Sequence, residues 1–451
     1  MPYEGEFAQY RSLRRLAESE RVRQLLGSFR VREHASQHPV ANMVRFADAL
    51  PSEWLPEWVL AVDGSHAEVA VRNGYPQAEA SYGTVASVLI DLKKMREFDA
   101  HRPVDPRQFR TMEQPDSIDW ALPGCNVVLD GHESAKSSLR RSLLDVLATA
   151  RMSSDGESLL DTYETLLAHK PDSQVQRCPN DDCPSPRHDY CRGQGQYSCP
   201  CPLKRPLYST DALRIHEGMN LEGSNGAMFA EVMQIVERLW VVHVLRTCEA
   251  KGWLSSLQRL AIVIDGPLAV FGHPAWLSHA ISLELMRIND RAREATGGLD
   301  MLWIGIEKTG PFVDHFNALD MHADGSPGTV SPQTAILLDD PYIKEHIIFS
   351  VSAKPYGQDT YFGRKLFYKT ASGARIVASL PILSPNQGDM SRAQIDQFPR
   401  LNDAVTLLDS LVSSRFPNAL APLVAAHAEA AIPLHLGAKV LERLAKEWMS
   451  Q

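Results

Sequence analysis

The sequence predicts an α/β fold in which helices flank a mixed sheet, and three observations support this prediction. Residues 59–62 and 261–264 are apolar runs that each end in Asp-Gly, as expected for buried strands that stop at a turn. Residues 84–91 follow residues 69–71 across Asn73-Gly74, which is a hairpin signal. Segments of helical periodicity separate these strands, so the sheet is predicted to be covered by helices.

The remaining elements can be placed in order along the chain. We expect helices over residues 5–50, 133–150, 227–250 and 275–292 and from 403 onward, and strands at 301–306 and within 344–382. The order is therefore a strand ending in Asp, hairpin strands, a helix, a second strand ending in Asp, a helix and a strand. This is the order of a ribonuclease H-like sheet, in which the first and fourth strands each supply an Asp and the helix between them supplies a Glu.

Length and composition suggest a large globular protein with an internal insertion. The chain has 451 residues, of which 44% are hydrophobic, which is ample for a sizeable core. We divide it into an N-terminal helical segment (1–54), a ribonuclease H-like domain (55–400) with a cysteine-rich insertion (171–210), and C-terminal helices that pack on that domain (401–451). No apolar stretch reaches the length of a membrane helix and no secretory signal begins the chain, so a cytoplasmic location is expected.

The net charge of −9 does not indicate a nucleic-acid binder, although a basic groove can lie within an acidic protein. The basic residues of the N-terminal segment, from Arg11 to Arg23, are equally typical of a solvated helix face. The chain contains no Gly-x-x-x-x-Gly-Lys-Ser/Thr loop, so we do not expect it to hydrolyse ATP itself.

Five of the seven cysteines lie between positions 178 and 201. In a cytosolic chain such clustering favours a metal site over disulfides, and thiolates on short loops suit a tetrahedral Zn²⁺ site. The predicted structural zinc ligands are Cys178, Cys183, Cys199 and Cys201, with Cys191 and His188 as further candidates. Unligated reduced thiols and a catalytic metal site are the alternatives.

Two acids at strand ends indicate a site for divalent cations. Asp63 and Asp265 each follow a predicted buried strand, and hard cations prefer oxygen ligands held on rigid elements. Asp-Gly is also an ordinary turn sequence, which is the alternative for each. The 227–250 helix offers Glu231 and Glu237 on opposite flanks of the apolar stripe formed by Val232, Val236, Leu239 and His243, and we prefer Glu237. Glu249 lies closer in sequence to the second strand.

Several segments resemble the NurA nucleases, in a bacterial form that carries a cysteine-rich insertion. The resemblance covers roughly residues 55–440 and is carried by residues 61–65, 264–268, 305–308, 361–381 and 425–427. It implies a ribonuclease H-like fold, degradation of DNA with Mn²⁺ or Mg²⁺, and a HerA-type hexameric translocase as partner. It further implies Asp63, Asp265 and Glu237 as metal ligands, with Lys308 and His427 at the rim of the active site. Lys308 could alternatively be a surface lysine, and His427 an ordinary helix histidine.

The resulting hypothesis is a divalent-metal-dependent deoxyribonuclease, acting as an exonuclease, an endonuclease or both. The resemblance implies work with a HerA-like ATPase in DNA end processing or in defence against foreign DNA, and we expect a homodimer. One alternative is an adaptor of the translocase that binds DNA without cutting it. Another is an unrelated phosphoryl-transfer or hydrolytic enzyme that uses the same carboxylates.

Overall fold

The computed structural model divides the chain into two compact units, residues Met1–Pro39 and Val40–Gln451. It describes residues 10–30, 43–46, 52–71, 78–96, 113–171, 176–180, 182–184, 187–188, 193, 195–322, 325–413, 418–432 and 436–448. The first unit contains helices α1 (Arg11–Glu18) and α2 (Glu20–Ser28), in which no residue is buried. Ser19 begins α2 as its N-cap, because its hydroxyl accepts a hydrogen bond from the Val22 amide.

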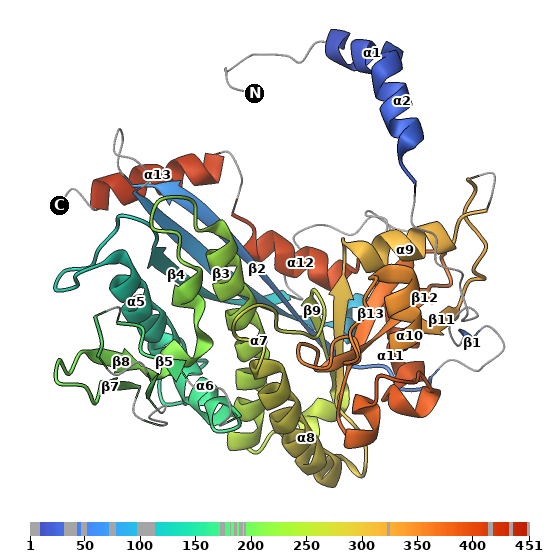
Figure 1. The fold of residues 1–451 in the computed structure, drawn as a ribbon. Coiled ribbons are helices and arrows are strands. Elements are labelled where there is room, and N and C mark those ends of the chain that lie inside the picture. Colours follow the sequence, from blue (N-terminus) through green and yellow to red (C-terminus); the bar gives the residue numbers. More distant parts are fainter. Residues whose placement is uncertain are drawn as a thin grey trace. The chain divides into compact units, whose positions relative to one another are not determined.

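The second unit is built on a sheet of nine described strands in the order β1-β11-β12-β13-β10-β9-β2-β3-β4 (Figure 1). The strands are β1 (Met43–Arg45), β2 (Trp58–Ala70), β3 (Glu79–Asp91), β4 (Glu113–Pro123), β9 (Leu260–Asp265), β10 (Leu302–Glu307), β11 (Thr334–Leu337), β12 (Gly363–Lys369) and β13 (Arg375–Pro381). Strands β2, β3 and β4 pair antiparallel, whereas β9 is parallel to both β2 and β10. This arrangement confirms the predicted ribonuclease H-like mixed sheet.

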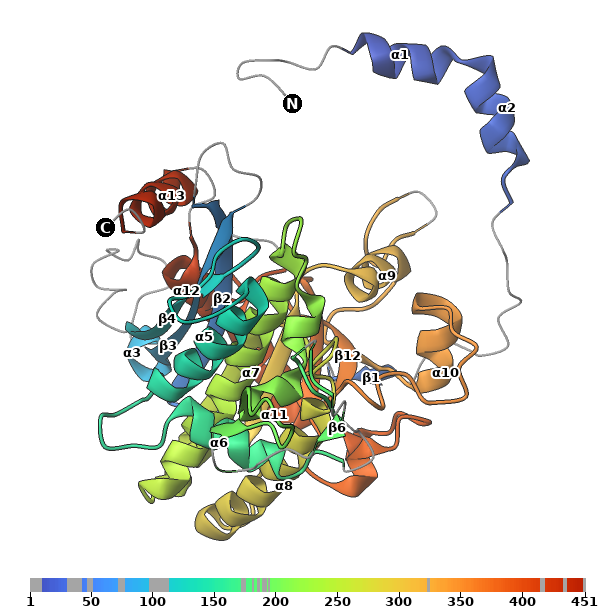
Figure 2. The same ribbon diagram turned by 60° about the vertical axis from the view of Figure 1, so that its left-hand side comes forward.

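Helices cover both faces of this sheet, as Figures 1 and 2 show. One face packs against α5 (Ala135–Thr149), α6 (Leu159–Leu167), α7 (Gly226–Ala250) and α8 (Leu277–Thr296), and the other against α11 (Leu401–Leu411) and α12 (Ala421–Ala430). The other helices described in this unit are α3 (Leu92–Arg96), α9 (Pro311–Leu319), α10 (Asp340–Tyr342) and α13 (Leu436–Trp448). Within the described residues, no helix combines the length and apolarity that a membrane crossing requires.

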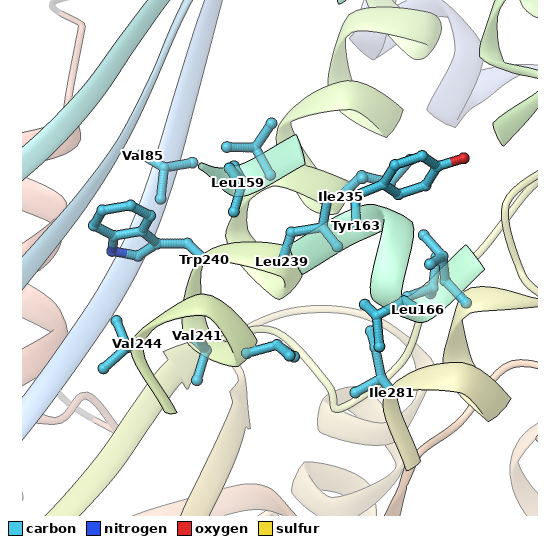
Figure 3. Close-up of a cluster of buried hydrophobic side chains, with 14 of the residues drawn as sticks. Val85, Leu159, Tyr163, Leu166, Ile235, Leu239, Trp240, Val241, Val244 and Ile281 are labelled. Atoms are coloured by element: carbon cyan, nitrogen blue, oxygen red, sulfur yellow. The ribbon is translucent and has the colours of Figure 1, made fainter. Parts of the chain in front are cut away.

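Burial on both faces explains why the central strands are continuous apolar runs rather than alternating ones. In β2, Leu60 and Val62 belong to the core beneath α7, whereas Val59 and Ala61 belong to the core beneath α12. Figure 3 shows part of the larger core, where Leu239 and Trp240 of α7 meet residues of α6, α8 and the sheet. The predicted stripe of α7 is fully buried, since Val232, Val236, Leu239 and His243 are all 0% exposed.

Two element predictions are wrong in part. Residues 43–45, predicted as helix, form strand β1 and pair with β11. The strand predicted from residue 344 begins only at Gly363, because residues 340–347 form α10 and a π-helical turn. Asp339 caps that turn by accepting a hydrogen bond from the Tyr342 amide, which is a helix-start signal in the sequence. The predicted hairpin is confirmed by the pairing of β2 with β3, while its Asn73-Gly74 turn lies outside the described residues.

The cysteine-rich insertion contains short paired strands rather than a large element. Strands β5 (Gln176–Arg177) and β6 (Arg187–His188) form one pair, and β7 (Gln196–Ser198) and β8 (Pro206–Tyr208) form another. Arg140 of α5 fastens this region to the helical layer, because its guanidinium forms two hydrogen bonds of 2.6 and 2.7 Å with the buried carboxylate of Asp211. Asp211 directly follows the insertion, and Arg140 Nη2 also donates to the carbonyl of Pro206 within it at 3.1 Å, so these contacts tie the insertion to the helical layer.

Candidate active site

Asp63 and Asp265 lie side by side where two parallel strands separate. The register pairs Val62 of β2 with Ile264 of β9, so the next residue in each strand is the predicted acid. Each carboxylate accepts a hydrogen bond from the amide of the following glycine, at 2.9 Å for Asp63 and 3.1 Å for Asp265. Asp63 is only 2% exposed, so its charge lies within the protein.

The two glycines that follow these acids have different structural roles. Gly266 has a φ of +79° and begins the turn that the sequence predicts. Gly64 does not end its strand, because β2 continues to Ala70 in its pairing with β3. A Cβ atom at Gly64 would lie 2.5 Å from Glu237 Oε1, so the glycine allows the helix acid to approach the strand. The predicted turn at Gly64 is therefore wrong, and close packing against α7 is the reason for the glycine.

Glu237 is the α7 acid that lies beside Asp63. It is 5% exposed, and its Oε2 accepts a hydrogen bond of 2.9 Å from Arg238 Nη1. Glu231 instead accepts a hydrogen bond of 2.9 Å from the His273 amide. Glu249 forms ion pairs with arginines 287 and 291 of α8. Of the three candidate acids, the structure thus brings only Glu237 next to Asp63.

Lys308 and His427 also reach the two aspartates. Lys308 follows β10, and its Nζ lies 3.1 Å from Asp265 Oδ2 and 3.9 Å from Asp63 Oδ2. His427 Nδ1, on α12, lies 2.9 Å from Asp63 Oδ2, while its side chain remains 61% exposed. All five predicted site residues therefore meet at one end of the central strands, although they span more than 360 positions of sequence.

These positions belong to a segment with a recognisable family signature, since residues 203–432 match the model of the NurA domain. The chain belongs to the NurA family. The matched segment includes Glu237, Asp265, Lys308 and His427, and Asp63 precedes it. Among solved structures, the chain is similar to the NurA nuclease from Sulfolobus solfataricus, with 9% sequence identity and a TM-score of 0.35 over 91% of this chain and 88% of that chain. A comparison with curated proteins gave no match.

Burial makes negative charge costly in this NurA-family site. Burial raises the pKa of Glu237 to about 8, and Arg238 opposes the shift. Burial, and then the neighbouring Asp265, raise the pKa of Asp63 to about 6, while Lys308 and His427 counteract the rise. Acids held in this way are stabilised by any cation that binds between them, which is the electrostatic condition for a divalent-metal site.

A second cluster of metal-binding groups lies in the insertion. The Sγ atom of Cys199 lies 3.9 Å from that of Cys178 and 3.6 Å from that of Cys183, and the three atoms lie within 4.8 Å of one another. Four thiolates around one Zn²⁺, each bonded at about 2.3 Å in a tetrahedron, would lie about 3.8 Å apart. Cys201 is buried in the same cluster. Cys191 and the side chain of His188 lie outside the described residues.

Arg238 is the site residue that the sequence analysis missed. It is 3% exposed and contacts both Glu237 and the main chain that follows Asp265. The available signal was the pair Glu237-Arg238 inside an otherwise apolar helical run, since a charged pair at such a position must be compensated internally.

The raised pKa of Glu237 predicts how stability depends on pH. Between the ordinary pKa of 4.5 and the folded value of about 8, the folded protein binds more protons than the unfolded chain, so its stability falls as pH rises. Glu237→Gln removes this penalty. In buffer with a chelator, the variant should therefore melt above the wild type at pH 8, by roughly 2 °C or more, and the gap should close near pH 4.

The measurement is thermal unfolding followed by circular dichroism across this pH range. Added Mn²⁺ should raise the melting temperature of the wild type more than that of the variant. A variant that melts below the wild type at pH 8 in chelator would contradict the electrostatic account.

Proposed function

We propose that this protein is a divalent-metal-dependent deoxyribonuclease. The observation that carries the proposal is the meeting of Asp63, Asp265 and Glu237 at the end of a ribonuclease H-like sheet, with Lys308 and His427 in contact with the aspartates. Membership of the NurA family supports the same reaction class. The alternative of an adaptor that does not cut DNA would not require this complete set of acids.

The donor set suits Mn²⁺ or Mg²⁺. Both ions prefer oxygen ligands, and all three acids come from regular elements that fix their positions. The pKa values of Asp63 and Glu237 are raised by burial, so a bound cation would relieve an existing electrostatic strain. Asp63, Asp265 and Glu237 would hold the ions. When bound, two such ions supply an activated water and stabilise the leaving 3′ oxygen of a phosphodiester.

The basic residues would contribute substrate contacts. Lys308 is 35% exposed and already lies between two carboxylates, so its ammonium group can pair with the scissile phosphate. The Nδ1 atom of His427 is bonded to Asp63, which orients the ring and leaves Nε2 as the nitrogen that can exchange a proton with water or DNA. The exposed side chain of His427 places this nitrogen on the solvent side of the acids.

Asp63→Ala and Asp265→Ala should each reduce cleavage of linear DNA to background, because each removes a metal ligand and its charge. Glu237→Gln should lose most of the activity, whereas Glu249→Gln is the matched control on the same helix and should keep it. The measurement is product formation with Mn²⁺ or Mg²⁺ on linear and circular DNA. Near wild-type rates in either alanine variant would refute the assignment.

We also propose that the insertion holds one structural Zn²⁺. Cys178, Cys183 and Cys199 have sulfur atoms within 4.8 Å of one another, Cys201 is buried beside them, and the described strands around them have only two or three residues each. A structural metal would contribute folding free energy that this segment otherwise lacks.

Elemental analysis of anaerobically purified protein should find about one zinc per chain. Cys199→Ser should release the zinc and lower the melting temperature, while Cys248→Ser, which lies outside the cluster, should retain it. A mild chelator that removes Mn²⁺ or Mg²⁺ should stop cleavage and leave the zinc in place. Protein without zinc, folded and stable, would refute this part of the proposal.

A partner that delivers DNA completes the proposed function. The net charge of −9 gives the isolated protein little electrostatic attraction for DNA at physiological salt. We propose a homodimer that docks on a HerA-like hexameric ATPase, in DNA end processing or defence against foreign DNA. Helices α1 and α2 are a candidate docking surface, because they combine several arginines with exposed leucines, among them Leu13 at 62% and Leu25 at 57%.

The double variant Leu13→Glu and Leu25→Glu should fail to co-elute with the cognate ATPase, because it places negative charge on the exposed apolar positions. Its nuclease activity without the ATPase should be unchanged, and Gln24→Glu is the charge control on the same helices. Light scattering should give twice the chain mass for the isolated protein. A monomer whose activity is high alone and unaffected by the ATPase and ATP would exclude this arrangement.

A further inference from the structure

The main chain that follows Asp265 lies against Arg238 of α7. The Nη2 atom of Arg238 donates to the carbonyl oxygens of Asp265 and Pro267, at 3.1 and 3.2 Å. Its Nε atom donates to the carbonyl of Ala269 at 3.4 Å. A buried guanidinium thus donates to three carbonyls of a single loop, of which that of Pro267 also accepts a hydrogen bond from the Ala269 amide.

Two further side chains of α7 hold the same loop. The Oε1 atom of Gln234 accepts a hydrogen bond of 3.0 Å from the Phe271 amide, and Glu231 accepts one from the His273 amide. Positions 231, 234 and 238 are separated by three and four residues, so they form one stripe along the helix. We call these three residues the α7 clamp.

Glycines allow the loop to approach the clamp closely. A Cβ atom at Gly272 would lie 2.1 Å from Glu231 Oε1, and one at Gly266 would lie 3.0 Å from Arg238 Nη2. Both glycines have positive φ angles, of +77° and +79°, which other residues rarely adopt. Glycine is therefore suited to both positions, Gly266 against Arg238 and Gly272 against Glu231.

Arg238 also joins the loop to the helix acid, because its Nη1 atom donates to Glu237 Oε2. We propose that Arg238 is a positioning residue, which fixes the separation between Glu237 and Asp265 so that both acids can reach the same metal ions. This inference rests on the proposed metal-dependent function. The rigid fork of arginine can bond a carboxylate and several carbonyls at once, whereas the single ammonium group of lysine cannot reproduce that geometry.

Other contacts should keep the loop folded when the clamp is weakened. The Val270 amide donates to the carbonyl of Thr360, and the Leu268 amide donates to the hydroxyl of Ser379. Loss of Arg238 is therefore expected to move Asp265 relative to Glu237 rather than to unfold the domain. This expectation makes the proposal testable in the full-length protein.

The test compares Arg238→Met and Arg238→Lys with the wild type. Titration with Mn²⁺ alone, followed by the electron paramagnetic resonance signal of the free ion, should show binding weakened about 10- to 100-fold in Arg238→Met. The turnover number on DNA should fall by a similar factor with little change in KM, and Arg238→Lys should recover part of both losses. In chelator, hydrogen exchange at the amides of Phe271 and His273 should be faster in Arg238→Met.

Arg246→Met is the matched control, because Arg246 is another α7 arginine and pairs with Glu157 and Glu284 away from the acids. It should lower the melting temperature and leave Mn²⁺ affinity unchanged.

If Arg238→Met does not fold, Gln234→Ala provides the second variant, with faster hydrogen exchange at the Phe271 amide and weaker Mn²⁺ binding. Wild-type Mn²⁺ affinity and exchange in the folded variants would overturn the proposal. Weakened Mn²⁺ binding in a protein that never cleaves DNA would support the clamp and refute the nuclease function.

Discussion

The site depends on the hydrogen bond between Glu237 and Arg238, which lies almost completely inside the protein. Burying a guanidinium is costly unless hydrogen bonds satisfy its N–H donors. The acceptors are the carboxylate of Glu237 and carbonyls of the loop that begins at Asp265. The same side chain therefore contacts the helix acid and holds the main chain of the strand acid. The apolar stripe of α7 packs against the sheet and so holds the helix that carries both residues in place.

Much of the fold could be predicted because its elements have strong local signals. The central strands are buried on both faces and appear in the sequence as continuous aliphatic runs, and α7 shows a clear helical stripe. Short edge strands carry much weaker signals. Strand β1 has three residues and is formed only by pairing with β11, which lies almost 300 positions later. Local periodicity cannot reveal such a partner, and helix was therefore predicted at these residues.

The two aspartates of the candidate site could be predicted from the sequence, whereas the groups around them were harder to predict. Asp63 and Asp265 could be found because each follows an apolar run, and the parallel pairing of β2 with β9 stops directly before both acids. The contact between His427 and Asp63 brings together residues 364 positions apart. This contact was not predicted from the sequence, and the family resemblance implied only that His427 lies at the rim of the site. Arg238 carried a signal, a charged pair in an apolar helix, but its partners are main-chain carbonyls that no side-chain pattern reveals.

The two proposed metal sites of the chain differ in the type of ligand atom. The insertion gathers soft thiols within 4.8 Å of one another on short loops, and such ligands select ions like Zn²⁺. The acids at the end of the sheet offer only oxygen, which suits Mn²⁺ and Mg²⁺. The two aspartates are moreover bridged by Lys308, a partly exposed side chain that a substrate or an ion can displace. The proposed zinc site would therefore be a closed structural centre, and the proposed acid site an exchangeable one, within a single folded unit.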